Sequence, residues 1–383
     1  MRQTRWVLCV GHVVDDLYQG AVPALIPYLA LARHYDYTQA AGITLAATLL
    51  SSLAQPLFGV LTDRYALPPL IPVGMSLAGL GIGLSGLSES YLLTWLAVAL
   101  SGLGVAAYHP EAARSARAAS EGSHVFMGWF SLAGNMGFAL GPLAVPLVLE
   151  SGGLTATPAL AVPALLMAAV TVVVLRRHPA PLSVGSRSPE GEELDDQWGP
   201  FLRLTVVVVC RSVMSFGLAA FLALYTQERF DAGPLTGEAV LLAFFLASAA
   251  GTLGGGRLAE RFSRVLIMRV SYLAVLPGLA MLVFATGPAF LLGVVWTGLA
   301  MNTPFSLHVT LGQDYLPTRV GTASGVTLGL AVSIGGIAAP LFGALADATS
   351  LQTSLATMLV IPLIAAGFTT GLRDPLLTPA PRR

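Results

Sequence analysis

The sequence of 383 residues contains no lysine, and only 10% of its residues are charged. A soluble domain carries about 25% charged residues, so most of this chain must face lipid instead of water. All 20 basic residues are arginine, which excludes a Walker A lysine and a Schiff-base lysine. Any uphill transport by this chain must therefore use an ion gradient or a partner.

Cysteine and net charge are scarce as well. Cys9 and Cys210 lie in apolar stretches and predict buried thiols, so no disulfide framework, metal site or cofactor is expected. The formal net charge of zero argues against nucleic acid as a partner. The first apolar run follows two arginines, as in a signal peptide, but Asp15 and Asp16 interrupt it. We therefore expect an uncleaved first spanning helix.

Hydrophobic residues make up 55% of the chain and form runs long enough to cross a membrane. We expect spans at about 6–32, 39–62, 70–87, 91–113, 125–149, 156–176, 201–227, 237–259, 264–285, 288–312, 320–347 and 351–371. The predicted fold is an all-α membrane protein with twelve transmembrane helices. Its predicted parts are an N-terminal bundle of six helices (1–176), a cytoplasmic linker (177–199) and a C-terminal bundle of six (200–383).

The two halves repeat one motif at equivalent turns. Its copies are Gly59-Val-Leu-Thr-Asp63-Arg64 and Gly256-Arg-Leu-Ala-Glu260-Arg261, 197 positions apart. An offset near half the chain predicts two pseudo-symmetric bundles. The glycines would allow close helix approach, and the acid–arginine pairs would gate the cytoplasmic side; plain helix-end charge is the alternative. With the N-terminus inside, 17 of 20 arginines fall on the cytoplasmic side, which predicts two cytoplasmic termini.

The first segment holds the deepest charges. His12, Asp16 and Gln19 are four and three residues apart and so share one stripe of a helix. Asp16 lies about 15 Å into the helix, near the membrane midplane. A carboxylate there is costly unless it faces a cavity, is neutralised or pairs. We expect Asp16 to carry a proton, with Asp15 as the second candidate; a structural carboxylate bonded to a neighbouring helix is the alternative.

Residues 108–117 place His109, Glu111 and Arg114 at the end of an uncharged run. Glu111 and Arg114 are three apart and share a helix face, and histidine titrates near neutral pH. These groups predict proton handling by His109 and Glu111 and gating by Arg114. The alternative is the aqueous end of a membrane helix.

Arg211 is the basic counterpart, roughly ten residues into the seventh segment. It either pairs with Asp15 or Asp16 or binds an anionic substrate, and the sequence leaves both open. The other residues expected to contact substrate are His12, Gln19, Tyr18, Phe216, Tyr225, Trp296 and His308.

The fifth segment contains Gly134, Gly137, Gly141 and Pro142. Small residues at this spacing allow close helix packing, which is also the alternative to a gating role for Gly137, Gly141 and Pro142. The element resembles the Gly-x-x-x-Gly-Pro motif of proton-coupled exporters of the major facilitator superfamily, and the repeated loop motif resembles that of the same superfamily.

A more specific resemblance, to the fosmidomycin-resistance efflux family, rests on several motifs together. They are Gly11-His12-Val-Val-Asp15-Asp16, Gln55-Pro56, Tyr108-His109-Pro110-Glu111-Ala-Ala-Arg114, Gly134-Asn135-Met-Gly137 and Gln313-Asp314-Tyr-Leu316-Pro317-x-Arg319-x-Gly321. The resemblance implies proton-coupled drug export, an acid at Asp16 and a basic residue at Arg211.

We therefore expect a monomeric proton:drug antiporter in a bacterial cytoplasmic membrane, with a small molecule, protons and lipid as partners. The alternative within transport is proton symport or facilitated uptake of a sugar or small metabolite. A membrane-embedded enzyme or a receptor is the other class. An enzyme is not expected, because the sequence offers no complete nucleophile–base pair or metal cluster, and catalysis would not account for the internal repeat.

Overall fold

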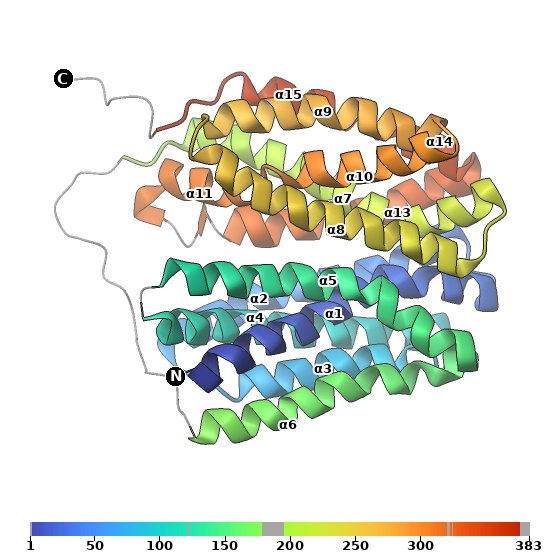
Figure 1. Ribbon diagram of the computed structural model, residues 1–383, viewed down its shortest axis with the longest axis horizontal. Coiled ribbons are helices and arrows are strands. Elements are labelled where there is room, and N and C mark those ends of the chain that lie inside the picture. The colour runs from blue at the N-terminus through green and yellow to red at the C-terminus, as the bar shows by residue number, and fades with distance from the viewer. Residues whose placement is uncertain (1, 122, 178–194, 320–321, 324, 376–383) are drawn as a thin grey trace. The chain divides into compact units, whose positions relative to one another are not determined.

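The computed structural model describes the chain except for residues 1, 122, 178–194, 320–321, 324 and 376–383 (Figure 1). The side chains of 2, 63–64, 124–125 and 328–333 also lie outside the description. The described residues form helices, turns and short connections and contain no strand. The predicted all-α fold is therefore confirmed.

The first half of the chain forms six long helices. They are α1 (Arg2–Arg33), α2 (Tyr37–Arg64), α3 (Leu70–Leu84), α4 (Tyr91–Ser120), α5 (His124–Gly152) and α6 (Val162–Arg177), with the 3₁₀ helix η1 (Gly153–Ala161) before α6. The second half contains α7 (Trp198–Phe230), α8 (Pro234–Ala259), α9 (Arg264–Phe284), α10 (Pro288–Asn302), α11 (Phe305–Tyr315), η2 (Pro317–Arg319), the π-helix η3 (Gly325–Leu330), α13 (Ala331–Ala348), α14 (Leu351–Thr357) and α15 (Val360–Thr369).

The described helices account for each of the twelve expected spans. Eight helical stretches are long and apolar enough to cross a membrane, and one of them, Phe126–Arg177, contains both α5 and α6. The shorter apolar helices Leu70–Leu84 and Ile334–Ala348 add two more spans. The last is α1, in which Asp15 and Asp16 interrupt the apolar sequence.

Local sequence signals set several helix ends. Asp36 and Gln39 form a capping box at the start of α2, because the Gln39 amide donates to the Asp36 carboxylate at 2.6 Å and the Asp36 amide donates to the Gln39 side chain at 3.2 Å. Gly153, with φ 58°, lets the chain leave α5 and enter η1. These devices satisfy backbone groups that the helix ends would otherwise leave unpaired.

Two compact units emerge from the contacts within the chain. Unit 1 comprises Met1–Pro189 and Ala220–Leu242, and unit 2 comprises Glu190–Ala219 and Ala243–Arg383. Most of the predicted linker, 177–199, falls on residues outside the description. The predicted domain boundaries therefore stay a prediction.

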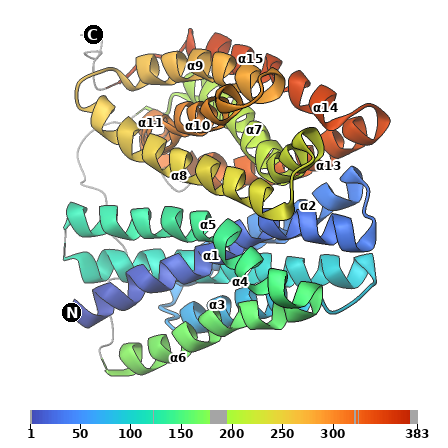
Figure 2. The same ribbon diagram turned by 45° about the vertical axis from the view of Figure 1, so that its right-hand side comes forward.

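In unit 1, α1 packs along α5 (Figures 1 and 2). The two backbones meet at glycines, since a Cβ added to Gly141 would lie 2.1 Å from the Gly20 carbonyl carbon. A Cβ added to Gly137 would lie 2.3 Å from the Val13 carbonyl oxygen. The predicted close packing of Gly137 and Gly141 is therefore confirmed, and it fixes the position of α5 against the charged face of α1.

Candidate functional site

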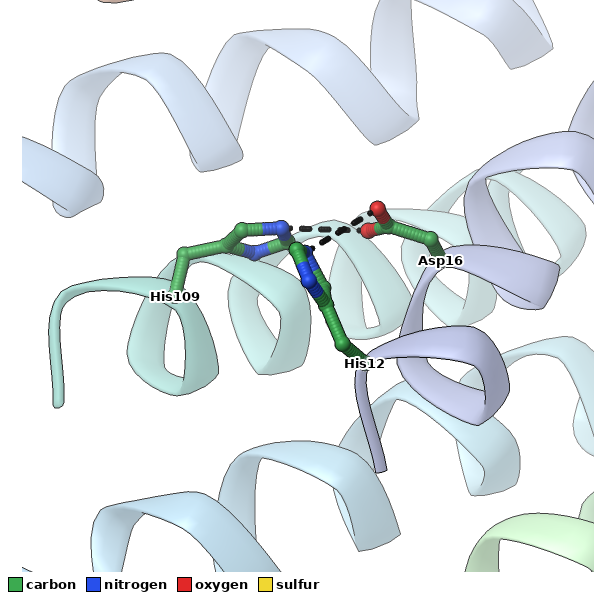
Figure 3. A group of neighbouring side chains, drawn as sticks. All are labelled: His12, Asp16 and His109. Atoms are coloured by element: carbon green, nitrogen blue, oxygen red, sulfur yellow. Dashed lines mark ion pairs between the residues drawn. The ribbon is translucent and has the colours of Figure 1, made fainter. Parts of the chain in front are cut away.

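A buried cluster of ionisable side chains joins α1 to α4 in unit 1 (Figure 3). His12 and Asp16 lie one turn apart on α1, and His109 reaches them from α4. The distance from His12 Nε2 to Asp16 Oδ2 is 3.3 Å, and His109 Nε2 lies 3.0 Å from Asp16 Oδ1. Both carboxylate oxygens of Asp16 therefore face an imidazole nitrogen.

Backbone carbonyls fix the orientation of both imidazole rings. Nδ1 of His12 is 2.8 Å from the Phe130 carbonyl oxygen, and Nδ1 of His109 is 2.9 Å from the Val105 carbonyl oxygen. A carbonyl oxygen only accepts hydrogen bonds, so each Nδ1 must carry the hydrogen and donate it. The Phe130 ring also stacks on His12, with centroids 4.2 Å apart. Each ring thus presents Nε2 to Asp16.

This arrangement determines how many protons the cluster needs. A neutral ring with its hydrogen on Nδ1 has a lone pair on Nε2, and an ionised carboxylate offers only lone pairs. Each of the two contacts to Asp16 becomes a hydrogen bond only when a proton lies between nitrogen and oxygen. The cluster is therefore closed by two protons in addition to those on Nδ1, whether they reside on the rings or on Asp16.

Asp15 adds a second carboxylate beside the same ring. Its side chain is fully buried, and neither oxygen has a hydrogen-bond partner among the described residues. Oδ2 lies 3.7 Å from His109 Nδ1. A buried carboxylate without donors is costly unless a positive charge compensates it, so a protonated His109 favours the ionised form of Asp15.

The rest of the α1 stripe and α5 complete the cluster. The Gln19 side chain donates to Asp16 Oδ1 at 2.5 Å, so the predicted alignment of His12, Asp16 and Gln19 is confirmed. Gly134 of α5 leaves the space that the cluster occupies, because a Cβ there would lie 2.5 Å from Asp16 Oδ2 and 2.8 Å from His12 Nε2.

Glu111 and Arg114 form a separate pair further along α4. Their side chains share a face and are joined by an Arg114 Nε to Glu111 Oε2 hydrogen bond of 3.0 Å, which confirms the prediction of a shared face. Glu111 Oε2 also accepts from the Leu67 amide at 3.3 Å. Glu111 therefore holds the connection between α2 and α3, whereas His109 contacts α1.

A buried cation lies in unit 2. Arg211 of α7 is 7% exposed, donates to Asn302 Oδ1 at 3.3 Å and lies 4.7 Å above the Phe305 ring. Its Nε has no partner, and no carboxylate of the described part of unit 2 forms an ion pair with it. A buried guanidinium without a counter-ion is suited to an anionic ligand.

Near Arg211, His308 lies 1% exposed on α11. Its Nε2 is 3.1 Å from the Tyr272 hydroxyl, and the two rings stack at 12°. Its Nδ1 has no partner among the described residues. The polar groups around Arg211 thus include one ring nitrogen still able to bond a ligand.

Unit 1 also contains an apolar cleft between α1 and α5, with a volume of about 510 Å³. Its lining residues are Arg5, Trp6, Cys9, Val10, Val13, Phe126, Trp129, Leu132, Ala133 and Met136. Volumes of about 300–1,000 Å³ are typical of small-molecule sites. Arg5 is already engaged by the Ala119 carbonyl at 2.6 Å and by Glu121 at 2.7 Å, so the cleft suits a largely apolar molecule.

Comparison with known proteins identifies the family. The sequence model of the Major Facilitator Superfamily matches residues 8–340 and 204–379. The chain belongs to the Major Facilitator Superfamily. This membership confirms the superfamily predicted from the loop and glycine motifs, and with the fold it indicates a membrane transporter of small molecules.

Two curated relatives in this superfamily span nearly the whole chain. A fosmidomycin resistance protein of Escherichia coli (strain K12) is 29% identical over 93% of this chain and 89% of its own length. The uncharacterized MFS-type transporter YfnC of Bacillus subtilis (strain 168) is 27% identical over 94% and 90%. The predicted resemblance to fosmidomycin-resistance proteins is thus confirmed by a relative of that name that aligns with nearly the whole chain.

Solved transporters of low sequence identity share the fold. A bacterial homolog to the human lysosomal transporter Spinster, inward-facing and occupied, superposes with a TM-score of 0.79 at 15% identity, covering 96% of this chain and 95% of that one. The nucleoside transporter NupG (D323A mutant) gives 0.78 at 11% identity, covering 96% and 99%. The predicted major facilitator fold is therefore confirmed.

Two of the four aromatic residues predicted to contact substrate are buried in unit 1. Tyr18 is fully buried, donates to the Leu160 carbonyl at 2.8 Å and accepts from the Ala164 amide at 3.0 Å. Tyr225 is 2% exposed and accepts from Arg229. Both hydroxyls thus have partners within the protein, and the substrate contacts of Tyr18 and Tyr225 stay predictions.

The other two aromatic residues lie in unit 2. Trp296 is 45% exposed and donates its indole hydrogen to the Ala274 carbonyl at 2.7 Å. Phe216 is half-buried and covers Gly335, where a Cβ would lie 2.6 Å from the ring. Their substrate contacts stay predictions.

Among the described residues, no atom packs closely against the loop-motif glycines, and the close approach that they permit stays a prediction. A Cβ on Gly59 or Gly256 would have no described atom within 4 Å. The glycine that precedes Gly256 on α8, Gly255, is closely packed, because a Cβ there would lie 1.7 Å from the Thr303 carbonyl oxygen. Successive residues are about 100° apart around a helix, so Gly255 and Gly256 lie on different sides of α8.

The gating roles of these motifs stay predictions. Glu260 and Arg261 are exposed. The side chains of Asp63 and Arg64 lie outside the described residues, and Pro142 lies within the closely packed part of α5.

Sequence reasoning missed a buried acid and the aromatic cleft. Glu238 of α8 is 1% exposed, and neither carboxylate oxygen has a partner among the described residues. As the acid of an otherwise uncharged run, it could have been found. Trp6 and Trp129 line the cleft from two helices, and only the crossing of α1 and α5 brings them together.

Proposed function

We propose that this protein is a proton-coupled drug exporter. It exchanges protons for drug by alternating access, as a monomer in a bacterial cytoplasmic membrane with both termini in the cytoplasm. One observation carries the proposal: His12 and His109 each present Nε2 to Asp16 while Nδ1 is held by a carbonyl. The cluster then binds two removable protons within the spanning helices.

The charge of the cluster changes with these protons. With both rings cationic and both carboxylates ionised, the net charge of His12, Asp15, Asp16 and His109 is zero. Loss of both protons leaves two negative charges in a buried site. At an effective dielectric of about 20, an ion pair at the observed 3.0 Å is worth about 5 kcal/mol.

This Coulombic attraction, before the desolvation cost of the buried charges is subtracted, is of the order needed for a conformational change. A shift between two states from 1:99 to 99:1 takes about 5.5 kcal/mol. In the proposed cycle, protons entering from outside close the α1–α4 contacts, and their release to the cytoplasm opens them. Drug binds to the deprotonated state from the cytoplasm and leaves on the outside. Exchange is coupled because the protein changes readily between its inward-open and outward-open states only when it carries either protons or drug.

Two features support an anionic or amphipathic drug as substrate. Arg211 is a buried cation with no acid partner in the described part of unit 2, so an anionic drug would supply the counter-charge that its own unit does not provide. Fosmidomycin is a small phosphonate, and a relative with 29% identity is named for resistance to it. The apolar cleft of about 510 Å³ between α1 and α5 suits the hydrophobic part of larger drugs.

The test compares Asp16→Asn with Glu89→Gln, a conservative change at an exposed acid outside the cluster. Protein in vesicles with an imposed pH gradient is assayed for drug-driven proton flux and for drug transport. Asp16→Asn should abolish the proton flux and leave only downhill drug movement, because an asparagine amide can donate to Nε2 without an added proton. Glu89→Gln should exchange like the wild type.

Wild-type exchange by Asp16→Asn would overturn the proton assignment. The direction of the wild-type flux decides between antiport and the alternative. If an inward proton gradient drives drug inward rather than outward, the protein is a symporter.

A further inference from the structure

We propose that His12, Asp16 and His109 also form a binding site for one divalent transition-metal ion of the zinc class, which replaces the two protons of the cluster. Binding itself is independent of the proposed transport cycle; inhibition of transport by the metal rests on that cycle. The sequence reasoning expected no metal site, because the third ligand comes from another helix.

The ligand atoms have suitable spacing. One nitrogen of each histidine and one oxygen of Asp16 all lie within 4.8 Å of one another. His12 Nε2 lies 3.3 Å from Asp16 Oδ2, and His109 Nε2 lies 3.0 Å from the other oxygen, Oδ1. Tetrahedral zinc with bonds of about 2.0–2.1 Å has ligand atoms about 3.3 Å apart, so small side-chain adjustments would place an ion between the three groups (Figure 3).

The outer contacts of the rings are those of metal-binding histidines. Such histidines donate their second ring hydrogen to a carbonyl or carboxylate, which fixes the tautomer and aims the other nitrogen at the metal. The Phe130 carbonyl does this for His12, and the Val105 carbonyl does it for His109. Gln19 supports the ligating carboxylate by donating to Asp16. The cluster thus has both ligands and their supports.

Charge balance favours a doubly charged ion. Asp15 is fully buried, has no hydrogen-bond partner among the described residues and lies 3.7 Å from His109 Nδ1. With neutral rings, Asp16 contributes one negative charge, and a divalent ion bound there favours ionisation of the neighbouring Asp15, so that the two carboxylates together neutralise the ion. Ligand exchange replaces the proton on each Nε2 with the metal, and both protons leave to solvent.

Ligand chemistry selects the class of metal. Imidazole suits Zn²⁺, Co²⁺ and Ni²⁺, whereas Ca²⁺ and Mg²⁺ prefer six or more oxygen ligands. The His109 side chain is 23% exposed, which leaves an approach for the ion and for a water as fourth ligand. Among the described residues His308 belongs to no comparable group of ligands, since its Nε2 faces the Tyr272 hydroxyl and Arg211 is a neighbouring cation.

The experiment titrates purified, chelator-treated full-length protein with Zn²⁺ by calorimetry and with Co²⁺ by visible absorption. We expect one ion per chain and a Co²⁺ spectrum typical of tetrahedral coordination. His109→Gln and Asp16→Asn should each weaken binding at least ~100-fold, because even loss of a supporting contact costs about 10–100-fold. His34→Gln, at an exposed histidine, should bind like the wild type.

Several results would overturn the site. They are absence of zinc binding by the wild type, unchanged affinity in both ligand variants, or equal affinity for Mg²⁺. Thermal unfolding of each metal-free variant shows whether it is folded. If a variant is not, the Co²⁺ spectrum of the wild type decides, since an octahedral spectrum contradicts the three-ligand site.

Transport in vesicles separates this inference from the proposed function. Zinc should inhibit drug-driven proton flux in the wild type, and the chelator should restore it. Proton-coupled export without zinc binding would refute the metal site alone. Zinc binding by a protein that shows no proton flux would refute the proposed function alone.

Discussion

Replacing Gly141 with alanine tests whether the contact between α1 and α5 positions the charged cluster. The new Cβ would lie 2.1 Å from the Gly20 carbonyl carbon and 2.4 Å from the Ala21 amide nitrogen. Carbon atoms in contact are normally about 3.5–4.0 Å apart. Because the obstructing atoms are backbone, the two helices must separate by about 1.5 Å.

This separation has a cost in stability and an effect at the site. Overpacking of this kind destabilises by about 1–3 kcal/mol, which lowers the unfolding temperature of a unit of this size by about 2–12 °C. The hydrogen bond from His12 to the Phe130 carbonyl, now 2.8 Å, joins the same two helices. A shift of that size takes it beyond the usual limit of about 3.2 Å, so His12 loses its fixed orientation.

Gly128→Ala is the matched control on the same helix, because a Cβ there has no atom within 4 Å. It carries the same gain in helix propensity, about 1 kcal/mol, without the clash. Both variants are measured by thermal unfolding in detergent and by drug-driven proton flux. Gly141→Ala should unfold earlier and exchange more slowly than Gly128→Ala. Equal behaviour of the two would refute the inference that this crossing positions His12.

Three further predictions address other parts of the chain. Tyr18→Phe should lower stability by about 1–3 kcal/mol in thermal unfolding without changing drug preference; a changed preference would place Tyr18 in the substrate site. Arg211→Ala should raise the half-saturation concentration for an anionic drug ~10–150-fold, the equivalent of about 1.5–3 kcal/mol; equal loss for a cationic drug would indicate a structural role. The Thr318 hydroxyl, with Arg319, lowers the pKa of Asp196. A pKa that is lower in the folded state adds to the stability of the folded protein at pH values above the usual carboxyl pKa. The contact between Asp196 and Thr318 should therefore persist on acidification until the pH falls through the lowered pKa, which hydrogen exchange at the Thr318 amide would show. Loss of the contact already at the usual carboxyl pKa would contradict this prediction.

The fold could be predicted because its signals are local or repeated. The sequence shows individual helices through apolar runs and through the glycine spacing in α5, and it shows the internal symmetry through the recurring loop motif. None of these signals depends on how the helices cross. The alignment of His12, Asp16 and Gln19 belongs to the same class, since three residues of one helix share a face at fixed spacing.

What the sequence could not show are contacts between helices. His109 is 93 positions from Asp16, and nothing in their spacing indicates that they meet. Conversely, nearness in the sequence does not show a shared site. His109 and Glu111 are two residues apart on α4, yet His109 contacts α1 and Glu111 contacts the connection between α2 and α3. On α8, Gly256 of the motif has open space around it whereas the preceding Gly255 packs closely, and a helix turns about 100° over one residue.

The position of His109 and Glu111 on one helix has a thermodynamic consequence. His109 contacts α1, and Glu111 holds the Leu67 amide in the connection between α2 and α3. A movement of α4 that changes one contact changes the other, so the two are linked and the linkage is reciprocal. An antibody fragment or lipid that binds the 65–69 connection and holds it in one conformation would change the affinity of the buried cluster for cations. Cation binding to the cluster would change the affinity for that antibody fragment or lipid by the same factor.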